Sequence, residues 1–193
     1  MRYRPLFSIT LKNTHDQYLG IPAEEIVMRK ILTIFLSLNL WMATTFAEGN
    51  LAITKTAQIN APASAVWSKL RDFNALNSWH PAVISDEIIE GENNTVGAVR
   101  LLTLVDGGTI KEKLLAWDDA GMSMTYNILE GVLPVSSYVS TLKVEILTDT
   151  SSKVTWSSSF NAADGADNKK ASDTISGIYE DGLDHLLKIM SSP

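Results

Sequence analysis

The imidazole of His80 is the first group in this sequence whose surroundings could support chemistry. It lies in the stretch NSWHPAV, between a tryptophan and a proline. A histidine titrates near neutral pH, so it could orient the polar end of a ligand or transfer a proton. It could equally donate a ring N–H to a backbone carbonyl at a helix end and be structural. Metal binding is not expected, because His80 and His185 are the only histidines after residue 47 and no HxH or HExxH spacing occurs.

Glu112, in the stretch KEKLLAWDD, is the second candidate. If Gly107 and Gly108 form a two-residue hairpin turn, Glu112 faces Thr103 on a side of the hairpin that is otherwise apolar, and Arg100 lies on the wetter side. A carboxylate on an apolar face is costly unless it is paired or hydrated. Glu112 is therefore either a polar group of a cavity, with a raised pKa and the capacity to transfer protons, or part of an internal salt bridge or buried water site.

Three tyrosines could each present a hydroxyl group to an internal cavity, although aromatic residues in a core often only pack: Tyr126, Tyr138 and Tyr179. The tryptophans after residue 47 are expected chiefly to pack: Trp67, Trp79, Trp117 and Trp156. Nucleophilic catalysis is not indicated, because the chain has no cysteine and no GxSxG motif. A glycine-rich phosphate loop is also missing from the sequence, so we expect no nucleotide and no other cofactor.

The elements that must position these residues follow from the hydrophobic pattern. Residues 51–59 alternate as a strand, Pro62 begins a short helix, and Asp72 can cap a second short helix that ends at Pro81. Alternation and turn residues then predict six strands, at 82–90, 96–105, 109–117, 122–130, 135–147 and 153–161. A final helix of about 20 residues carries large side chains at helical spacing: Ile175, Tyr179, Leu183, Leu186 and Met190.

This order predicts an α+β fold. Six consecutive hairpin-linked strands form an antiparallel sheet, and the first strand brings the number to seven. The apolar face of the sheet needs a cover, and the final helix is the only predicted element long enough to provide it. Gly177 and Gly182 within that helix indicate a close approach to the sheet. A strongly curved sheet wrapped around a helix leaves a space that side chains need not fill.

The order of elements resembles the START-like or Bet v 1-like (SRPBCC) superfamily of helix-grip proteins. Within it, the chain is most similar to bacterial polyketide cyclase/dehydrase-type members and to plant abscisic-acid receptors. The resemblance covers about residues 53–187 and is densest in four stretches: VWSKLRDFNALNSWHPAV, GAVRLLTL, EKLLAWDDAGMSMTYNILEG and PVSSYVSTLKV. It implies a helix-grip fold with a ligand cavity between the sheet and the long C-terminal helix.

The resemblance also implies a role for each candidate. His80 matches the position where the hormone receptors place a lysine against the ligand carboxylate, and Glu112 matches their water-linked pocket glutamate. Tyr126 matches a pocket phenylalanine, Tyr138 matches a pocket tyrosine, and Tyr179 falls where the last helix faces the cavity. The lid loop of the receptors is longer than the tight hairpin predicted here, so the resemblance does not extend to a lid-gated hormone switch.

Residues 28–47 have the pattern of a secretory signal peptide. Arg29 and Lys30 form a positive region before an apolar run, and small residues predict cleavage after Ala47. The apolar run is about 12 residues, whereas a membrane span needs roughly 20. We therefore expect export and no integral membrane span after cleavage.

Residues 1–27 precede this segment, although a signal peptide should begin at the N-terminus. We expect them to be a mis-assigned start, with translation beginning at Met28, or a disordered tail. Residues 48–193 then form a START-like helix-grip domain with 11 positive and 19 negative side chains, a net charge of −8. This charge disfavours nucleic acid and anionic lipid as partners. Without cysteine, the domain must be stable in an oxidising compartment without disulfides.

These features together predict a periplasmic or secreted protein that binds a small, mostly hydrophobic ligand in an internal cavity lined by the five candidate residues. Burial of ~300 Å² of ligand at roughly 25 cal/mol per Å² corresponds to about 7 kcal/mol, or micromolar affinity before ordering costs. Two alternatives remain open. One is a cyclase or dehydratase that uses His80 or Glu112 as general acid or base. The other is an accessory factor with a periplasmic protein partner, since one exported member of the family assists periplasmic methanol oxidation.

Overall fold

The computed structural model describes residues 49–191 of the chain. The elements in order are β1 (Leu51–Ile59), α2 (Ala63–Leu70), the 3-10 helix η1 (Leu76–Ser78), β2 (Val83–Glu90), β3 (Val99–Leu104), β4 (Thr109–Asp118), β5 (Ser123–Gly131), β6 (Val135–Thr148), β7 (Ser151–Ala162) and α3 (Asn168–Met190). The predictions for residues 1–27 and for the signal segment 28–47 fall outside the described residues. No helix within residues 49–191 combines the length and the apolar character that a membrane span requires.

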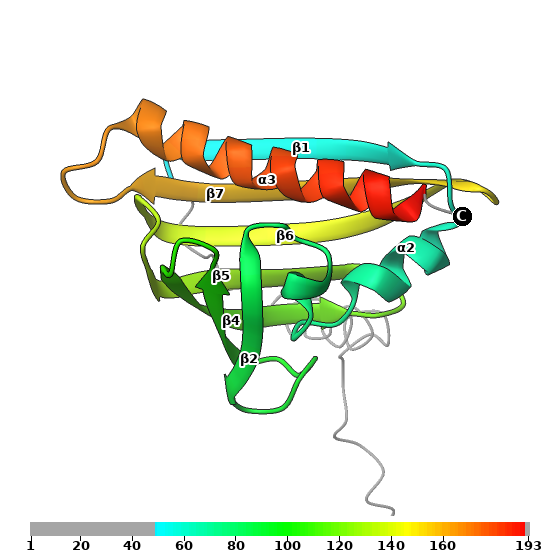
Figure 1. The fold of residues 1–193 in the computed structure, drawn as a ribbon, viewed down its shortest axis with the longest axis horizontal. Helices are drawn as coiled ribbons and strands as arrows, with labels where there is room; N and C mark the ends of the chain where they lie inside the picture. Colours follow the sequence, from blue (N-terminus) through cyan, green and yellow to red (C-terminus); the bar gives the residue numbers. More distant parts are fainter. Residues whose placement is uncertain (1–48, 192–193) are drawn as a thin grey trace, which may run out of the picture. The chain divides into compact units, whose positions relative to one another are not determined.

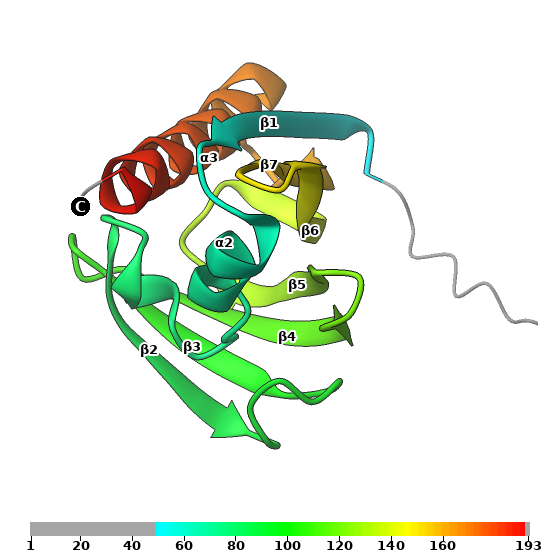
Figure 2. The same cartoon turned by 90° about the vertical axis from the view of Figure 1, so that its right-hand side faces the viewer.

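The seven strands form one antiparallel sheet in the order β1-β7-β6-β5-β4-β3-β2 (Figure 1). The sheet curves strongly. In Figure 2 it runs from β1 at the top through β6 and β5 to β2 at the bottom, and α2 lies inside the curve. The predicted α+β helix-grip fold with seven strands is confirmed, and every strand ends within three residues of its predicted bounds.

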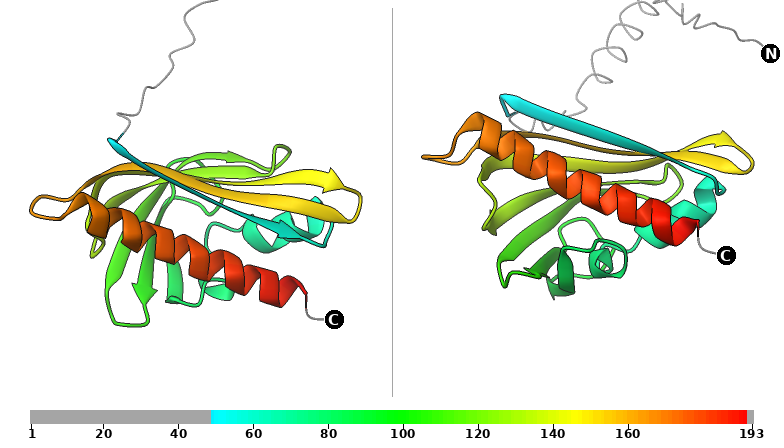
Figure 3. Two further views of the ribbon diagram at one scale, coloured as in Figure 1. Left: turned by 90° about the horizontal axis from the view of Figure 1, so that it is seen from above. Right: turned by 45° about the horizontal axis from the view of Figure 1, so that its top comes forward.

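Helix α3 lies along β1 and β7 on the inner side of this curve (Figure 3). Asp167 caps its first turn, because its side chain accepts a hydrogen bond from the backbone N–H of Lys170. Residues at helical spacing are buried on one face of the helix: Ala171, Ile175, Tyr179, Gly182, Leu183 and Leu186. The spacing that predicts the helix from the sequence therefore also determines which face it turns towards the sheet.

The second short helix is smaller than predicted. Only the single 3-10 turn η1 forms, and its N-cap is Ala75, which makes no side-chain cap bond. The side chain of Asp72 instead accepts a hydrogen bond from the backbone N–H of Asn74 at 2.9 Å. The segment after η1 is fixed to α3, since Nδ1–H of His185 donates to the carbonyl oxygen of Trp79 at 2.8 Å.

The turn between β3 and β4 also differs from the prediction. Residues 105–108 form a four-residue loop in place of a two-residue turn at Gly107 and Gly108. Asp106 stabilises the loop by accepting a hydrogen bond from the backbone N–H of Gly108 at 2.9 Å, and Gly107 has a φ of +86° that favours glycine. The backbone N–H of Val105 donates a hydrogen bond to the carbonyl oxygen of Ala82, outside this hairpin, at 3.0 Å.

The longer loop shifts the pairing of β3 with β4, so that Arg100, and not Thr103, lies opposite Glu112. Because side chains alternate along a strand, the shift reverses the two faces of β3. Arg100 was predicted on the wetter face, but it is buried, with 3% of its surface exposed. Glu112 is buried as its own pattern predicts, with 5% exposed.

Candidate functional site

A cavity of about 70 Å³ lies between α3 and the inner face of the sheet. Most of its wall is aliphatic, and three partly exposed side chains, Leu104, Leu133 and Ile178, form part of it. The five residues proposed from the sequence all line this same cavity: His80, Glu112, Tyr126, Tyr138 and Tyr179. None of the five has more than 5% of its surface exposed. The fold thus brings together residues that lie up to a hundred positions apart in the chain.

The cavity is small for a ligand site. An apolar cavity of about 150 Å³ holds one benzene molecule, and this one has about 70 Å³. A ring-sized molecule therefore fits only if partly exposed side chains such as Leu133 and Ile178 turn outward. The cavity therefore suits a ligand smaller than the one in the sequence-based estimate, which buries ~300 Å² of surface.

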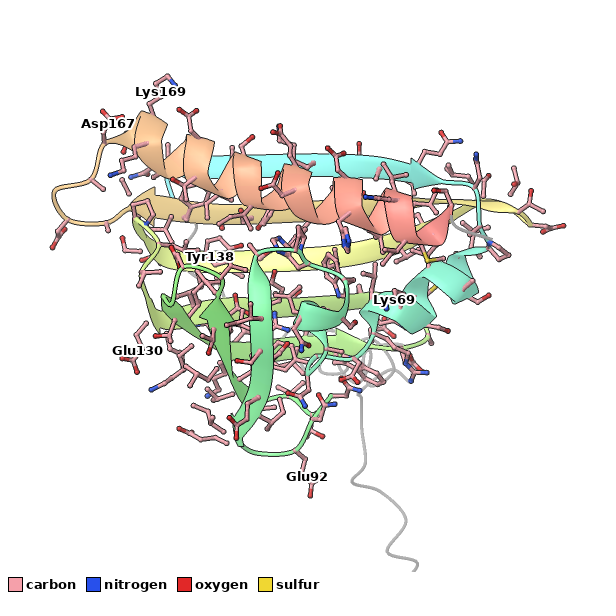
Figure 4. The ribbon with its side chains drawn as sticks, viewed as in Figure 1. Lys69, Glu92, Glu130, Tyr138, Asp167 and Lys169 are labelled. Carbon is pink, nitrogen blue, oxygen red and sulfur yellow. The ribbon has the colours of Figure 1, made fainter. Side chains whose placement is uncertain are left out.

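Tyr138 reaches the cavity because β6 has a bulge directly before it. The pairing of β6 with β7 shifts by one residue between Ser136 and Val139, and Ser137 has a φ of +50°. One extra residue reverses the alternation of side chains along a strand. Val135 consequently packs against the core before the bulge, and Tyr138, labelled near the start of β6 in Figure 4, is buried after it.

Hydrogen bonds join the tyrosines into a chain with a defined direction. The hydroxyl of Ser140 donates to the carbonyl oxygen of Ser157 at 3.0 Å and accepts from the indole N–H of Trp156 at 3.1 Å. Since the one proton of Ser140 is used, Tyr179 must donate to Ser140 at 2.8 Å, and Tyr138 must donate to Tyr179 at 2.5 Å. The hydroxyl oxygen of Tyr138 therefore stands at the beginning of the chain and keeps its capacity to accept a hydrogen bond.

Trp156 connects this chain to Tyr126. Its indole N–H also donates to the Tyr126 hydroxyl oxygen at 2.9 Å, and its ring stacks on Tyr179 with the centroids 4.3 Å apart. Burial raises the pKa of Tyr126 and Tyr138 well above the usual range and raises the pKa of Tyr179 to about 12. All three phenols are therefore neutral at physiological pH and act as hydrogen-bonding groups.

Glu112 takes part in a buried ion cluster as well as in the cavity wall. Nε and Nη2 of Arg100 contact the same carboxylate oxygen, Oε2 of Glu112, at 2.8 and 2.6 Å. Nη1 of Arg100 lies 3.2 Å from Oδ2 of Asp86 and donates to the carbonyl oxygen of Phe73 at 2.6 Å. The sequence left two alternatives for Glu112, a salt bridge and a position in the cavity wall, and the structure shows both.

The ion cluster contains one cation and two carboxylates. Burial raises the pKa of Glu112 and of Asp86, and the positive charge of Arg100 opposes both shifts. Burial alone would lower the pKa of Arg100, but the two carboxylates raise it, so the guanidinium stays charged. Arg100 also lies over the ring of Phe73, 4.2 Å from its centroid.

His80 uses both of its ring nitrogens within the protein. Nε2 lies 2.9 Å from the carbonyl oxygen of Ile178, which can only accept, so Nε2 carries the proton. Nδ1 accepts a hydrogen bond from the backbone N–H of Ala82 at 3.2 Å and is therefore unprotonated. Burial lowers the pKa of His80, which agrees with a neutral ring. The imidazole lines the cavity, but neither nitrogen is free to meet a ligand in this arrangement.

The two glycines of α3 differ. A β-carbon at Gly182 would lie 2.7 Å from Cδ2 of His80 and 2.8 Å from Cζ3 of Trp156, so the predicted close approach is confirmed there. A β-carbon at Gly177 would meet nothing within 4 Å, so the prediction is wrong for that residue.

Several residues of the site were not proposed from the sequence: Asp86, Arg100, Ser140 and Trp156. Arg100 could have been found from its position two residues before Leu102 if the hairpin register had been known. Trp156 was expected chiefly to pack, and its N–H also donates to two hydroxyl groups, those of Tyr126 and Ser140. Within residues 49–191, the His, Asp and Glu side chains form no cluster of three that could hold a metal ion.

Comparison with known proteins identifies relatives over the whole described domain. The family model described as "Polyketide cyclase / dehydrase and lipid transport" matches residues 50–190. The solved structure of the protein XoxI from Bacillus cereus shares 32% identity, covering 72% of this chain and 94% of that one, with a TM-score of 0.67. A protein from Bacillus thuringiensis shares 31% identity over 74% of this chain and 100% of that one, with a TM-score of 0.68. A protein from Nitrosospira multiformis shares 27% identity, covers 74% and 97% of the two chains, and has a TM-score of 0.65.

Proposed function

Because the chain belongs to the polyketide cyclase/dehydrase and lipid transport family, we propose that it binds a small, mostly hydrophobic molecule in the cavity between α3 and the sheet, and that it does so outside the cytoplasm. The observation that carries ligand binding is the cavity itself, which combines a largely aliphatic wall with a few converging polar groups. Ligand sites in proteins have this composition.

The energetic cost of the cavity supports the same proposal. Protein interiors are close-packed, and an empty space destabilises the fold by about 24 cal/mol per Å³. At that rate a cavity of about 70 Å³ costs roughly 2 kcal/mol. A ligand that fills the space would remove this cost.

Native mass spectrometry of the protein isolated from its own host tests ligand binding. We expect a bound small molecule that is lost in Leu133→Trp, because this side chain lines the cavity. The control is Val132→Trp, at the adjacent position, where the side chain is 57% exposed and does not line the cavity. A protein that carries no small molecule, and whose amide NMR spectrum does not change on addition of toluene, would contradict ligand binding.

The location outside the cytoplasm rests on residues 28–47, whose sequence has the pattern of a signal peptide. Alkaline phosphatase is active only after export, so a fusion to residues 1–47 should give activity. Replacement of Arg29 and Lys30 by Glu should reduce it. The mass of the exported protein should correspond to cleavage after Ala47, whether translation starts at Met1 or at Met28. An uncleaved protein in the cytoplasm would refute export.

A cyclase or dehydratase activity is the second candidate, and it would depend on Glu112. His80 is poorly suited to proton transfer, because both of its nitrogens are hydrogen-bonded to the backbone. Glu112 lines the cavity, and burial raises the pKa of its carboxyl group. An activity that disappears in Glu112→Gln and survives in His80→Gln would support this candidate. A role as accessory factor to a periplasmic protein would instead appear as a protein partner in the same mass spectra.

A further inference from the structure

One oxygen of the Glu112 carboxylate has no partner. The contacts from Nε and Nη2 of Arg100, at 2.8 and 2.6 Å, both end on Oε2. Among the described residues, none donates a hydrogen bond to Oε1, although Glu112 is 5% exposed and lines the cavity. A carboxylate oxygen that meets a largely apolar cavity without a protein donor is poorly stabilised, so the site gains when a ligand supplies a donor. Arg100 contacts Glu112 more closely than Asp86, at 2.6 against 3.2 Å, which favours the ionised form of Glu112.

The hydrogen-bond chain of the tyrosines adds a second acceptor. The proton of Tyr138 is directed to Tyr179, and that of Tyr179 to Ser140, because Ser140 donates to a backbone carbonyl. Tyr138 lines the cavity, and its hydroxyl oxygen is left with accepting capacity. Glu112 and Tyr138 can therefore each accept a hydrogen bond from a donor group on the ligand.

The described part of the chain offers no free cation to this cavity. Arg100 does not line it, and all three of its nitrogens are bonded to Glu112, Asp86 and the carbonyl oxygen of Phe73. His80 lines it as a neutral ring with both nitrogens occupied. A ligand carboxylate would have to lose its water beside Glu112 without gaining a positive partner, which is strongly unfavourable.

We infer that the cavity selects compact, uncharged molecules that carry a hydrogen-bond donor, such as an alcohol or a phenol, and that it discriminates against carboxylates. The donor would bind Oε1 of Glu112, and the hydrocarbon part would contact the aliphatic wall. This inference rests on the proposed ligand binding and specifies its chemical class. It differs from the carboxylate recognition implied by the resemblance to hormone receptors, because His80 is not available as a cation.

Four single-ring probes test the inference on the unmodified protein: toluene, phenol, benzaldehyde and benzoate. Their affinities are measured at neutral pH by titration of the amide NMR spectrum. We expect phenol to bind about tenfold more tightly than toluene, since hydrogen bonds to charged groups are the stronger ones. Benzaldehyde, which has only an acceptor, should bind no more tightly than toluene, and benzoate should bind most weakly of the four.

The variant Glu112→Gln should remove the preference for phenol. Its amide oxygen can remain on Arg100, and its NH₂ group then faces the cavity as a donor, so benzaldehyde should bind more tightly than phenol. The control is Glu130→Gln, on a side chain that is 68% exposed and points away from α3 in Figure 4. It should leave the order of affinities unchanged.

The possible results separate the inference from the function on which it rests. Equal binding of toluene and phenol would overturn the inference while leaving a ligand cavity in place. Tighter binding of benzaldehyde than of phenol by the unmodified protein would also overturn it, because Glu112 would then be a protonated donor. Tightest binding of benzoate would overturn it as well. Failure of all four probes to bind would show that side chains such as Leu133 and Ile178 do not turn outward, and it would overturn both the inference and a cavity for ring-sized ligands.

Discussion

Gly182 of α3 lies directly against the imidazole ring of His80: a β-carbon at position 182 would come within 2.7 Å of Cδ2 of that ring. The same position is in contact with Trp156 of β7. These contacts set how closely α3 approaches the sheet, and with it the height of the cavity. The hydrogen bond from Nε2–H of His80 to the backbone carbonyl oxygen of Ile178, one helical turn before Gly182, holds the ring in this place.

Substitution of Gly182 by Ala should destabilise the domain, and the same substitution at Gly177 should not. The added methyl group at residue 182 meets two rigid rings, and overpacking of this kind costs about 1–3 kcal/mol. At residue 177 it meets nothing, and Ala is favoured over Gly within a helix by about 0.5–1 kcal/mol. Urea denaturation of both variants measures the difference in the free energy of unfolding. Equal effects at the two positions would contradict the close approach at Gly182.

The direction of the tyrosine chain predicts that Tyr179→Phe is more destabilising than Tyr138→Phe. Loss of the Tyr179 hydroxyl leaves the buried O–H of Tyr138 without its acceptor, at a cost of about 1–3 kcal/mol. Loss of the Tyr138 hydroxyl leaves only an unfilled acceptor on Tyr179, which costs less because the donor function of Tyr179 is kept. The free energies of unfolding of the two variants give the order. The reverse order would mean that the chain runs in the other direction.

Replacement of Arg100 by Met should lower the free energy of unfolding by roughly 3–5 kcal/mol at neutral pH, because Asp86 and Glu112 lose the cation between them. This loss of unfolding free energy should become smaller as the pH falls, because protonation removes the uncompensated charges of Asp86 and Glu112. Arg71→Met is the control. The pair of Arg71 with Asp119 is about 40% exposed, so its contribution is at most about 1 kcal/mol. Similar effects of the two variants would show that the buried cluster is not balanced by Arg100.

The lowered pKa of His80 predicts a pH dependence of stability. In the unfolded chain this residue titrates near 6.5, and in the folded domain burial lowers its pKa. The unfolded state therefore binds more protons between the two values. The stabilisation is complete above pH 6.5 and is lost as the pH falls towards the folded pKa, by at most about 1.4 kcal/mol per pH unit.

The variant His80→Gln isolates this effect from that of Asp86 and Glu112, whose raised pKa values act in the opposite direction. Unfolding by urea at several values between pH 7 and pH 5 should show a steeper loss of stability for the unmodified protein than for the variant. Parallel pH profiles would refute the prediction for His80.

The strands of this domain could be predicted closely, whereas one hairpin register could not. Val154, Trp156 and Phe160 alternate with polar residues along β7, and its inner face from Ser152 to Phe160 is buried at every second position. In β3 the sequence RLLTL has leucines on both faces, so alternation gives no preference between two registers. The register depends instead on Arg100, which reaches Glu112 and Asp86 only if it points inward.

Some residues of the site could be predicted from the sequence. Glu112 and Tyr179 have patterns that point inward, and both do so. Tyr138 has the opposite parity to Val135 along β6, so simple alternation would place only one of them inside. The bulge at Ser137 brings both to the inner side. A bulge of this kind has no clear signal in a single sequence.

The sequence by itself determined the order of elements, the seven strands, and the face that α3 presents, because these depend on hydrophobic periodicity and on local turn and capping residues. Only the tertiary structure decided which groups are free to act. Arg100 neutralises Glu112 on one oxygen and leaves the other open, and the backbone of α3 occupies the Nε2 nitrogen of His80. The physical reason is that hydrogen-bond and charge partners are chosen by proximity in space, across separations of up to a hundred residues that periodicity cannot connect.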